Sequence, residues 1–282
     1  MLKKPDWLRI SGARNPNSEA VVGVLQALQL NTVCNEAACP NQMECFSRKT
    51  ATFMTLGTAC TRSCRFCNVR NEPPKPIDID EPKRIAQAVS ELSMSYVVIT
   101  SVTRDDLPDG GASHFANVIR AIRANSPTTA IEVLAPDFGG DIAALKAVVE
   151  AFPNVISHNM ETVSALYSVV RPQADYTCSL ELLANIKKLN PAIRSKSGLM
   201  LGFGETEAQV YELLDDLRSV GCEFLTIGQY LAPTREHLPV SEYIEPYRFE
   251  EYGKIAREKG FLFVASAPLV RSSYYADEAL NV

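Results

Sequence analysis

Residues 51–67 read ATFMTLGTACTRSCRFC, an apolar run of β type followed at once by three cysteines. The run Ala51–Gly57 has the composition and the glycine end of a short buried strand. Cys60 stands just beyond it, at the point where a loop begins. Parallel α/β proteins carry their functional residues in the loops that follow their strands. This stretch therefore predicts both a type of fold and the position of a site.

Strand-like and helix-like segments alternate beyond this stretch. The further predicted strands are Ser95–Ser101, Ala130–Ala135, Val155–Asn159, Ser197–Gly202 and Glu223–Gly228. The predicted helices lie near residues 82–93, 111–125, 141–151, 179–189, 206–219 and 247–259. Strands that alternate with helices of this length form a parallel sheet with right-handed crossovers. We expect an α/β fold, a partial (β/α)6 TIM-type barrel with N- and C-terminal extensions.

The two ends of the chain differ in texture from this alternating region. The N-terminal part is rich in Asn, Pro and Cys and holds one helix-like stretch, Ser18–Leu28. Ser18 and Thr206 are the expected N-caps of their helices. The C-terminal part holds the strand-like run Phe261–Ala267 and a polar tail. We expect three parts, an N-terminal extension over 1–50, the barrel over 51–230 and a C-terminal extension over 231–282.

Composition and charge limit the class of protein. The 282 residues are 46% hydrophobic and 22% charged, with a formal net charge of −5, which excludes a disordered chain, a collagen-like fibre and a coiled coil. The acidic balance argues against a nucleic-acid partner. No apolar segment has the form of a secretory signal or the ~20 residues of a membrane span. We expect a cytoplasmic protein that binds no membrane.

Six of the eight cysteines form two triplets, Cys34, Cys39 and Cys45, then Cys60, Cys64 and Cys67. In a reducing compartment such clusters indicate metal binding or catalysis more often than disulfides. A [4Fe–4S] cluster normally takes four cysteines, so three leave one iron open to a small molecule. Structural zinc is the alternative, but it usually shows two paired C-x2-C units, and the second triplet contains one. For the first triplet, three buried or unligated thiols are the alternative.

The second triplet, with Phe66 before its last cysteine, resembles the signature of radical S-adenosylmethionine (SAM) enzymes. The order of the two triplets, the opening KPDWLR at residues 4–9 and the terminal Arg271-Ser272-Ser273-Tyr274 closely resemble the lipoyl synthase family, over essentially the whole chain. The resemblance implies a sulfurtransferase with SAM and two [4Fe–4S] clusters. Its reaction would place two sulfur atoms at carbon 6 and carbon 8 of a protein-bound octanoyl-lysine.

The resemblance also assigns the metal ligands. The radical-generating cluster would be held by the catalytic residues Cys60, Cys64 and Cys67. The auxiliary cluster, the implied sulfur source, would be held by Cys34, Cys39, Cys45 and a serine, for which we expect Ser273, with Ser272 as the alternative. Serine binds iron less well than thiolate, which suits a cluster that is dismantled. Arg271 is expected to close the site or hold the serine, whereas a solvated tail is the alternative.

Several loops are candidates for binding SAM. The expected contacts are Phe66, Asp105, Gly110, Asn159, Glu161, Gly198 and Gly202. Phe66 matches a position whose ring lies near the adenine, though it would serve equally as loop core. The stretch Gly198-x-Met200-x-Gly202-x-x-Glu205 resembles the superfamily's adenine-side motif, although tight strand-to-helix packing also explains its glycines. Around Gly110, an ordinary turn and helix start is the alternative.

The implied partners are an octanoylated lipoyl carrier domain, an electron donor such as ferredoxin or flavodoxin, and an iron–sulfur cluster carrier. The carrier would be the glycine-cleavage H protein or the lipoyl domain of a 2-oxoacid dehydrogenase acyltransferase. The basic residues Lys187, Lys188, Arg194 and Lys196 are solvated surface by default, but an acidic carrier would need such a patch. Cys178 and Cys222 are expected to be small buried residues, and no histidine stands at ligand spacing.

Two other kinds of protein remain as alternatives. The nearer is another radical SAM enzyme, such as biotin synthase, which lacks an N-terminal cysteine triplet, or a methylthiotransferase, which spaces its cysteines across a further domain. The more distant is a non-catalytic iron–sulfur or zinc protein.

Overall fold

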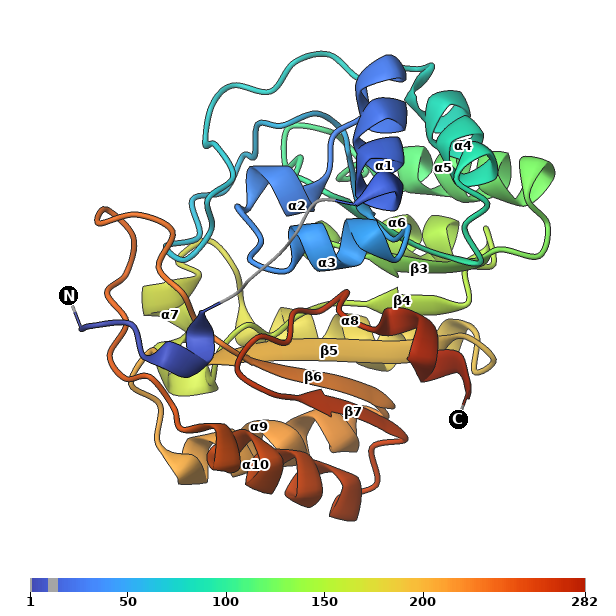
Figure 1. The fold of residues 1–282 in the computed structure, drawn as a ribbon. Coiled ribbons are helices and arrows are strands. Elements are labelled where there is room, and N and C mark those ends of the chain that lie inside the picture. The colour runs from blue at the N-terminus through green and yellow to red at the C-terminus, as the bar shows by residue number, and fades with distance from the viewer. Residues whose placement is uncertain (1, 10–14, 282) are drawn as a thin grey trace. The chain divides into compact units, whose positions relative to one another are not determined.

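Residues 2–9 and 15–281 of the computed structural model are described here, and they contain seven strands that follow one another in chain order in a parallel sheet (Figure 1). The strands are β1 (Thr52–Thr55), β2 (Tyr96–Ser101), β3 (Ala130–Leu134), β4 (Val155–Ser157), β5 (Arg194–Leu201), β6 (Phe224–Gln229) and β7 (Phe263–Ser266). The order ends at β1 and β7, so these strands form an open sheet. The α/β prediction is confirmed, and the strand-like run Phe261–Ala267 contributes β7.

Ten α-helices and four short 3-10 turns surround these strands in the part of the chain that is described. The helices are α1 (Pro16–Ala27), α2 (Val33–Glu36), α3 (Gln42–Ser47), α4 (Glu81–Glu91), α5 (Ala112–Asn125), α6 (Ile142–Val149), α7 (Tyr167–Val170), α8 (Tyr176–Leu189), α9 (Glu207–Ser219) and α10 (Pro246–Glu258). The turns are η1 (Asp6–Leu8), η2 (Phe138–Gly140), η3 (Ser164–Leu166) and η4 (Ala276–Asn281). None of these helices has the length and apolar character that crossing a membrane requires.

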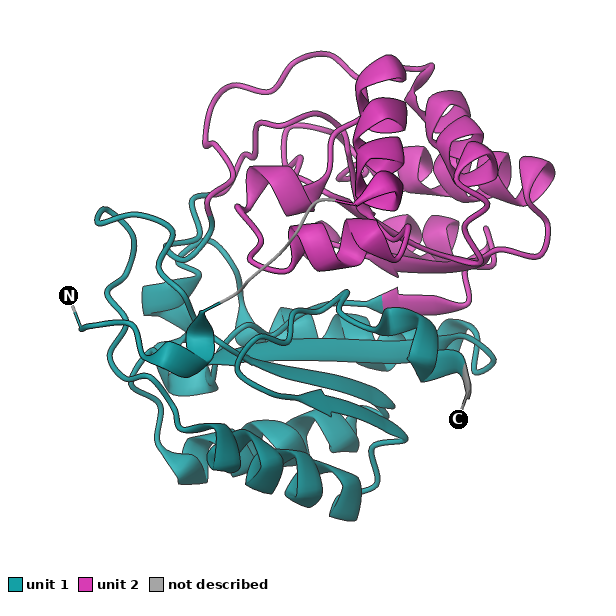
Figure 2. Ribbon diagram, in the orientation of Figure 1, with its two compact units in different colours: residues 1–10, 63–67, 157–282 teal, residues 11–62, 68–156 magenta. Residues whose placement is uncertain are grey.

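The chain divides into two compact units (Figure 2). Unit 1 comprises residues 1–10, 63–67 and 157–282, and unit 2 comprises residues 11–62 and 68–156. The second cysteine triplet is therefore divided, with Cys60 in unit 2 and Cys64 and Cys67 in unit 1. The three-part division by sequence texture follows other boundaries and stays a prediction.

Unit 2 is built on β1, β2 and β3, which pair in parallel. All of β1 and nearly all of β2 are buried, as expected for parallel strands that are covered on both faces. Helices α4 and α5 are amphipathic and bury residues such as Ile85, Val89, Phe115 and Ile119. At the end of β1, Met54 and Leu56 form a small apolar cluster with Val102, and Cys60 packs against this cluster.

Unit 1 is built on β5, β6 and β7, again in parallel. Ser266 Oγ on β7 donates to the carbonyl of Phe249 in α10, at 2.6 Å. On the opposite face of β6, a Cβ on Gly228 would lie 2.1 Å from the carbonyl oxygen of Val270. The chain after β7 therefore crosses the face of β6 that α10 does not cover, which agrees with Figure 1. The tail therefore packs against unit 1 and is not the solvated tail given above as the alternative.

The two predicted N-caps have different outcomes. Thr206 caps α9, and its side chain forms a capping box with Gln209. Ser18 is not the cap of α1, because the helix begins earlier, at Pro16, and Asn15 is the cap. Ser18 instead occupies the third helical position, where its hydroxyl bonds back to the Asn15 backbone. The proline at the first helical position favours this earlier start.

Candidate functional site

Cys60 lies in unit 2, where the chain turns away from β1. Leu56 and Gly57 adopt positive φ angles of 67° and 92° at this turn. The half-buried Cys60 is held by its own N–H, which donates to the Arg70 carbonyl at 2.8 Å. Two backbone N–H groups point at its sulfur, those of Arg62 at 3.4 Å and Thr103 at 3.3 Å. Donors of this kind stabilise a thiolate and suit a metal-binding sulfur.

Arg62, between Cys60 and Cys64, is pinned by two carboxylates. Its guanidinium donates to both oxygens of Asp105 at 2.8 Å and to the Asp137 oxygens at 2.5 and 2.8 Å. Burial lowers the pKa of Arg62, but the two carboxylates outweigh it and raise the pKa overall. Asp105 also bonds to the Thr61 hydroxyl. Asp105 is thus engaged in holding this loop, and its predicted contact with SAM stays a prediction.

Gly110 lies at the start of α5. Gly110 and Gly111 have positive φ angles of 60° and 90°, and a Cβ on Gly111 would lie 2.3 Å from Leu56 Cδ1. The Asp109 carboxylate accepts the N–H groups of Gly111 and Ser113 at 2.9 and 2.8 Å. The turn and helix start weighed as the alternative is therefore present, and a SAM contact at Gly110 stays a prediction.

The first triplet gathers on two short helical turns of unit 2. Cys34 lies in α2, Cys45 in α3 and Cys39 between them, where its N–H donates to the Cys34 carbonyl at 3.0 Å. Burial first, and then the charges of the neighbouring thiols, raise the pKa of Cys34 to about 11 and that of Cys45 to about 12. These mutual effects mean that the three sulfurs lie close together.

The donor chemistry of the first triplet fits an iron–sulfur cluster. None of the eight cysteines is disulfide-bonded. Three adjacent thiolates repel one another unless cations lie between them, so the set suits a thiophilic metal centre. Within the described residues, no three Cys, His, Asp or Glu side chains meet around the position of a single metal ion. A polynuclear cluster, in contrast, spreads its ligands over several irons.

The segment Ser63–Cys67 is held by two other parts of unit 1, the stretch 170–173 and His237. Gln173 Oε1 accepts from the Ser63 N–H at 2.6 Å, and the Arg65 N–H donates to the Val170 carbonyl at 3.0 Å. The ring of His237 bonds to the Cys67 carbonyl at 3.0 Å through Nε2. The Cys67 N–H donates to the Cys64 carbonyl at 3.0 Å, which closes a turn between the two ligands.

Phe66 opens a row of aromatic rings. Its ring meets that of Phe203 edge-on with centroids 6.4 Å apart, and Phe203 stacks on Tyr230 at 4.2 Å. Phe203 follows Gly202, whose φ of 107° and close approach to Gln229 require glycine. Phe66 and Gly202, predicted from separate motifs, are therefore brought together through Phe203.

The loop after Gly202 is held by Glu205. The Glu205 carboxylate accepts the N–H groups of Gly202 at 2.6 Å and Phe203 at 2.9 Å. Burial nevertheless raises the pKa of Glu205. The motif residues Gly202 and Glu205 thus shape their own loop, and a contact of Gly202 with SAM stays a prediction.

Asn159, Glu161 and Gly198 form a polar cluster in unit 1. The Asn159 amide nitrogen donates to Glu161 Oε1 at 3.0 Å, while Asn159 Oδ1 is buried without a hydrogen-bond partner in the described structure. A Cβ on residue 198 would lie 2.9 Å from that oxygen. Burial raises the pKa of Glu161, against the opposing charges of Arg171 and Arg271. An unsatisfied acceptor beside a glycine fits a ligand hydroxyl such as those of a ribose.

The C-terminal motif forms a turn after β7. Arg271 Nη1 donates to the Val270 carbonyl at 2.7 Å, and the Tyr274 N–H donates to the Arg271 carbonyl at 2.9 Å. Arg271 acts electrostatically on Glu161, so the tail and this polar cluster share one region of unit 1. Ser272 and Ser273 are both half-buried, and which of them would bind iron stays open.

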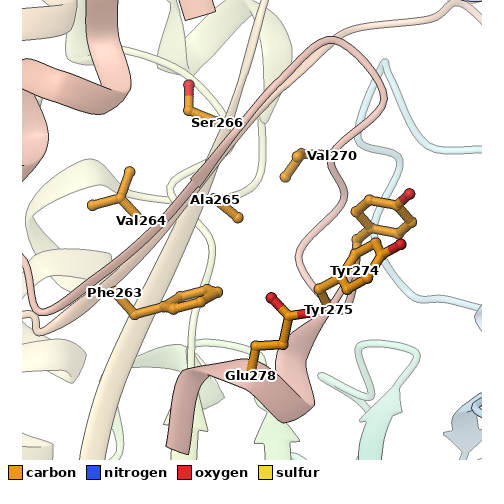
Figure 3. A pocket seen from close by; sticks show the side chains of 8 residues that line it. All are labelled: Phe263, Val264, Ala265, Ser266, Val270, Tyr274, Tyr275 and Glu278. Atoms are coloured by element: carbon orange, nitrogen blue, oxygen red, sulfur yellow. The ribbon is translucent and has the colours of Figure 1, made fainter. Parts of the chain in front are cut away.

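A pocket of about 300 Å³ lies between β7 and the returning tail (Figure 3). It is lined by Phe263, Val264, Ala265, Ser266, Val270, Tyr274, Tyr275 and Glu278. The ring of Phe263 and the carboxyl group of Glu278 both point into it (Figure 3). Its apolar wall and few oxygen atoms match a molecule with an aliphatic part and a polar end.

The basic residues weighed as solvated surface or as a patch for an acidic carrier are partly paired or buried. Lys187 and Arg194 both pair with Glu223, at 2.7 and 2.5 Å, and Lys196 is only 1% exposed. Their charges are therefore neutralised or removed from the surface. The prediction for Cys222 is confirmed, since it is fully buried, whereas Cys178 is half-buried.

Comparison with known proteins identifies the family. Residues 54–217 match the family model described as the radical SAM superfamily. A lipoyl synthase of Caldicellulosiruptor saccharolyticus is 57% identical over 280 residues, which cover 99% of this chain and 98% of the relative. The chain belongs to the lipoyl synthase family. A second lipoyl synthase, of Alkaliphilus metalliredigens, is 55% identical over 279 residues, with 99% and 96% coverage.

A solved structure supports the fold independently. Streptococcus suis SuiB bound to S-adenosylmethionine has a TM-score of 0.57 and 9% identity, covering 77% of this chain and 50% of that one. The predicted partial barrel is confirmed, with β7 as an additional parallel strand. Membership of the lipoyl synthase family also confirms the expected enzyme class, a radical SAM enzyme that inserts sulfur and uses iron–sulfur chemistry and SAM.

Several positioning residues were not found from the sequence. Arg62, Asp137, Arg171, Gln173 and His237 carry no motif of their own, and each acts through a partner that is distant in the chain. Among these residues, only Arg62 lies at a position that points to the site, because it stands between two of the predicted cluster ligands.

Proposed function

We propose that this chain inserts sulfur at carbon 6 and carbon 8 of an octanoyl group that is amide-linked to a lysine of a lipoyl carrier domain. At each carbon one hydrogen atom is removed and one carbon–sulfur bond forms, which leaves a dihydrolipoyl group. One SAM is cleaved for each hydrogen removed, at the cost of one electron from a donor protein. The observation that carries the proposal is the pair of cysteine triplets with the Arg271–Tyr274 tail in a chain of the lipoyl synthase family.

Cys60, Cys64 and Cys67 would hold the first [4Fe–4S] cluster. When bound, that cluster supplies the electron that cleaves SAM, and with it the radical chemistry. The chain's own residues fix the ligand loop: the N–H groups of Arg62 and Thr103 stabilise the Cys60 thiolate, and Gln173 holds Ser63. Each part of the ligand loop is thus held within its own unit.

The polar cluster of Asn159, Glu161 and Gly198 would contact SAM. Asn159 Oδ1 is an unsatisfied acceptor that would bond to a ribose hydroxyl. Phe66 would give the adenine an aromatic neighbour, backed by Phe203. These contacts orient the sulfonium without taking part in the bond cleavage.

Cys34, Cys39, Cys45 and Ser273 would hold a second [4Fe–4S] cluster, which is consumed as the sulfur substrate. The serine oxygen is a weaker iron ligand than a thiolate, so the iron that it binds would leave first. Arg271 would hold this end of the tail in place through its bond to Val270. Separate cysteine sets allow one cluster to be sacrificed while the other survives.

The proposed partners follow from this chemistry. An octanoylated H protein or acyltransferase lipoyl domain would present the substrate, ferredoxin or flavodoxin would donate electrons, and a cluster carrier would restore the sulfur source. Each of these steps needs reduced thiols, which the cytoplasm maintains.

The test is an anaerobic incubation of the cluster-loaded chain with an octanoyl-lysine peptide, SAM and a strong reductant. The peptide is expected to gain the mass of two sulfur atoms, with 5′-deoxyadenosine formed alongside. Cleavage of SAM without any gain in peptide mass would contradict the proposed reaction. An analogous peptide with an acetyl group in place of octanoyl serves as the control and should remain unchanged.

A further inference from the structure

A set of hydrogen bonds fastens Thr61 and Arg62 to the loop that follows β2. The Thr61 N–H donates to the Thr103 carbonyl at 3.0 Å, and the Thr61 hydroxyl donates to Asp105 Oδ2 at 2.9 Å. The Asp105 N–H in turn donates to Thr61 Oγ1 at 3.1 Å. The two segments are thus joined through both backbone and side chains.

Asp137 anchors this set from the loop that follows β3. Its side chain is 3% exposed and that of Arg62 is 9% exposed, whereas that of Asp105 is 44% exposed. Asp137 also accepts the Gly139 N–H at 2.9 Å, which fixes the carboxylate at the start of η2. A buried, doubly bonded ion pair is costly to break from one side. Asp137 is therefore the rigid support of Arg62, and Asp105 the more mobile one.

The two hydrogen-bonded segments, which contain Arg62 and Thr103, lie beside the sulfur atom of Cys60. The two N–H groups that point at Cys60 Sγ belong to Arg62 and Thr103, the residues that this set of bonds joins. If the Arg62–Asp137 pair is lost, the Arg62 N–H loses part of the support that directs it at Cys60, and the Thr103 N–H is affected through the bond that joins Thr103 to Thr61. Hydrogen bonds to a ligand sulfur stabilise the reduced, more negative state of an iron–sulfur cluster and so raise its reduction potential.

We propose that Asp137 is a positioning residue that, through Arg62, directs two backbone N–H groups at Cys60 Sγ and sets the reduction potential of the cluster bound there. The proposal rests on the assignment of Cys60 as a cluster ligand within the proposed function. It gives Asp137 a role in how readily the cluster accepts an electron, without contact with the substrate.

The test compares Asp137→Asn with the parent in a Cys39→Ala background, so that only the cluster on Cys60, Cys64 and Cys67 is loaded. The midpoint potential is measured by a redox titration followed by electron paramagnetic resonance, without SAM. Asp137→Asn should shift the midpoint to a more negative value at unchanged iron content. Its rate of SAM cleavage should fall with a weak reductant and recover with a strong one.

Two further variants separate positioning from general damage. Glu223→Gln breaks a partly buried ion-pair group of unit 1 that includes Lys187 and Arg194, and it should leave the midpoint unchanged. Arg62→Lys keeps the charge but loses the two-pronged geometry, so it should shift the midpoint in the same direction as Asp137→Asn. It also replaces Asp137→Asn if that variant does not fold.

An unchanged midpoint in either loop variant would overturn the proposal, as would an equal shift in Glu223→Gln. Failure of the proposed function has a different signature, namely a parent chain that cleaves SAM yet adds no sulfur to the octanoyl peptide. A parent chain that loads no iron would overturn both.

Discussion

Asn159 Oδ1 lies 2.9 Å from the point where a Cβ on Gly198 would stand. That oxygen is buried and has no partner among the residues that the structure describes. Thr226 Oγ1 lies still closer to the same point, at 2.5 Å. Asn159 and Thr226 can therefore pack against residue 198 only because it has no side chain, and Asn159 Oδ1 is left as an unsatisfied acceptor for a ligand.

Gly198→Ala should weaken SAM binding by about tenfold or more, equivalent to roughly 1.4 kcal/mol. The added methyl group would displace the side chains of Asn159 and Thr226, and with them the acceptor that Asn159 offers to SAM. Equilibrium dialysis of the cluster-loaded chain with SAM measures the change in Kd. Circular dichroism checks that the variant is folded.

Gly23→Ala is the matched control for this change. Gly23 lies within α1, and a Cβ there would have nothing within 4 Å. Alanine in a helix interior is favoured over glycine by up to about 1 kcal/mol, so this variant should be as stable as the parent or slightly more so. If both variants bind SAM like the parent, the polar cluster around Gly198 is not part of the SAM site.

Removing one cysteine from each triplet should separate the two halves of the reaction. Cys60→Ala is expected to abolish SAM cleavage, because the first cluster loses a ligand. Cys39→Ala is expected to retain SAM cleavage but to form no sulfur product. Chromatography of 5′-deoxyadenosine and mass measurement of the octanoyl peptide report the two activities separately.

The iron content of the parent and of the two triplet variants tests the same prediction independently. The parent should hold ~8 iron atoms per chain and each triplet variant about half of that, from ~4 iron atoms per cluster. Cys178→Ala, outside both triplets, should match the parent. Sulfur insertion by Cys39→Ala would refute the assignment of the first triplet as the sulfur store, and zinc without acid-labile sulfide would refute both assignments.

The sequence predicted the fold well because its strands are short apolar runs that end in turn residues. The predicted run Ser95–Ser101 contains β2 in full, and β5 begins only three residues ahead of the predicted Ser197. The prediction of Ser18 as the cap of α1 is wrong because Pro16 favours an earlier helix start. Asn15, which precedes it, is an equally good cap.

Residues of the candidate site could be predicted only where their type and their spacing in the sequence together indicate a chemical role. Cysteine triplets and glycines at strand ends have such a signature. Arg62 and Asp137 do not, since they are separated by 75 positions and meet only when the loops after β1 and β3 are in place. For the same reason the pairing of Lys187 and Arg194 with Glu223 could not be predicted, because Glu223 lies about 30 positions further along the chain.

Replacing the predicted serine ligand by cysteine should make the sulfur store more durable. In Ser273→Cys a thiolate would bind the iron that serine binds weakly, so the second cluster should assemble but release its sulfur more slowly. The expected result is normal iron content with a several-fold lower rate of product formation. Ser272→Cys is the matched comparison, and an effect confined to it would move the ligand to Ser272.

Cys222 should make folding stability depend on alkaline pH. Its side chain is fully buried, and this burial raises its pKa to about 12 against the opposing charge of Arg218. In the unfolded chain the thiol ionises near pH 8.5, roughly its unperturbed value. Because the pKa is raised in the folded state, the Cys222 thiol contributes to the free energy of unfolding in full below about pH 8.5. This contribution is lost as the pH rises toward about 12. The loss approaches about 1.4 kcal/mol per pH unit from this one group.

Urea unfolding of the reduced, cluster-free chain at several values between about pH 8 and pH 10.5 measures this slope. Cys222→Ala should unfold more easily at pH 8, since it leaves a small cavity, yet show a shallower decline with pH. Ile227→Val removes a buried methyl group from β6 without removing an ionisable group, so it should lower stability at all pH values and keep the parent's slope. Equal slopes in the parent and in Cys222→Ala would mean that the thiol is not held protonated by burial.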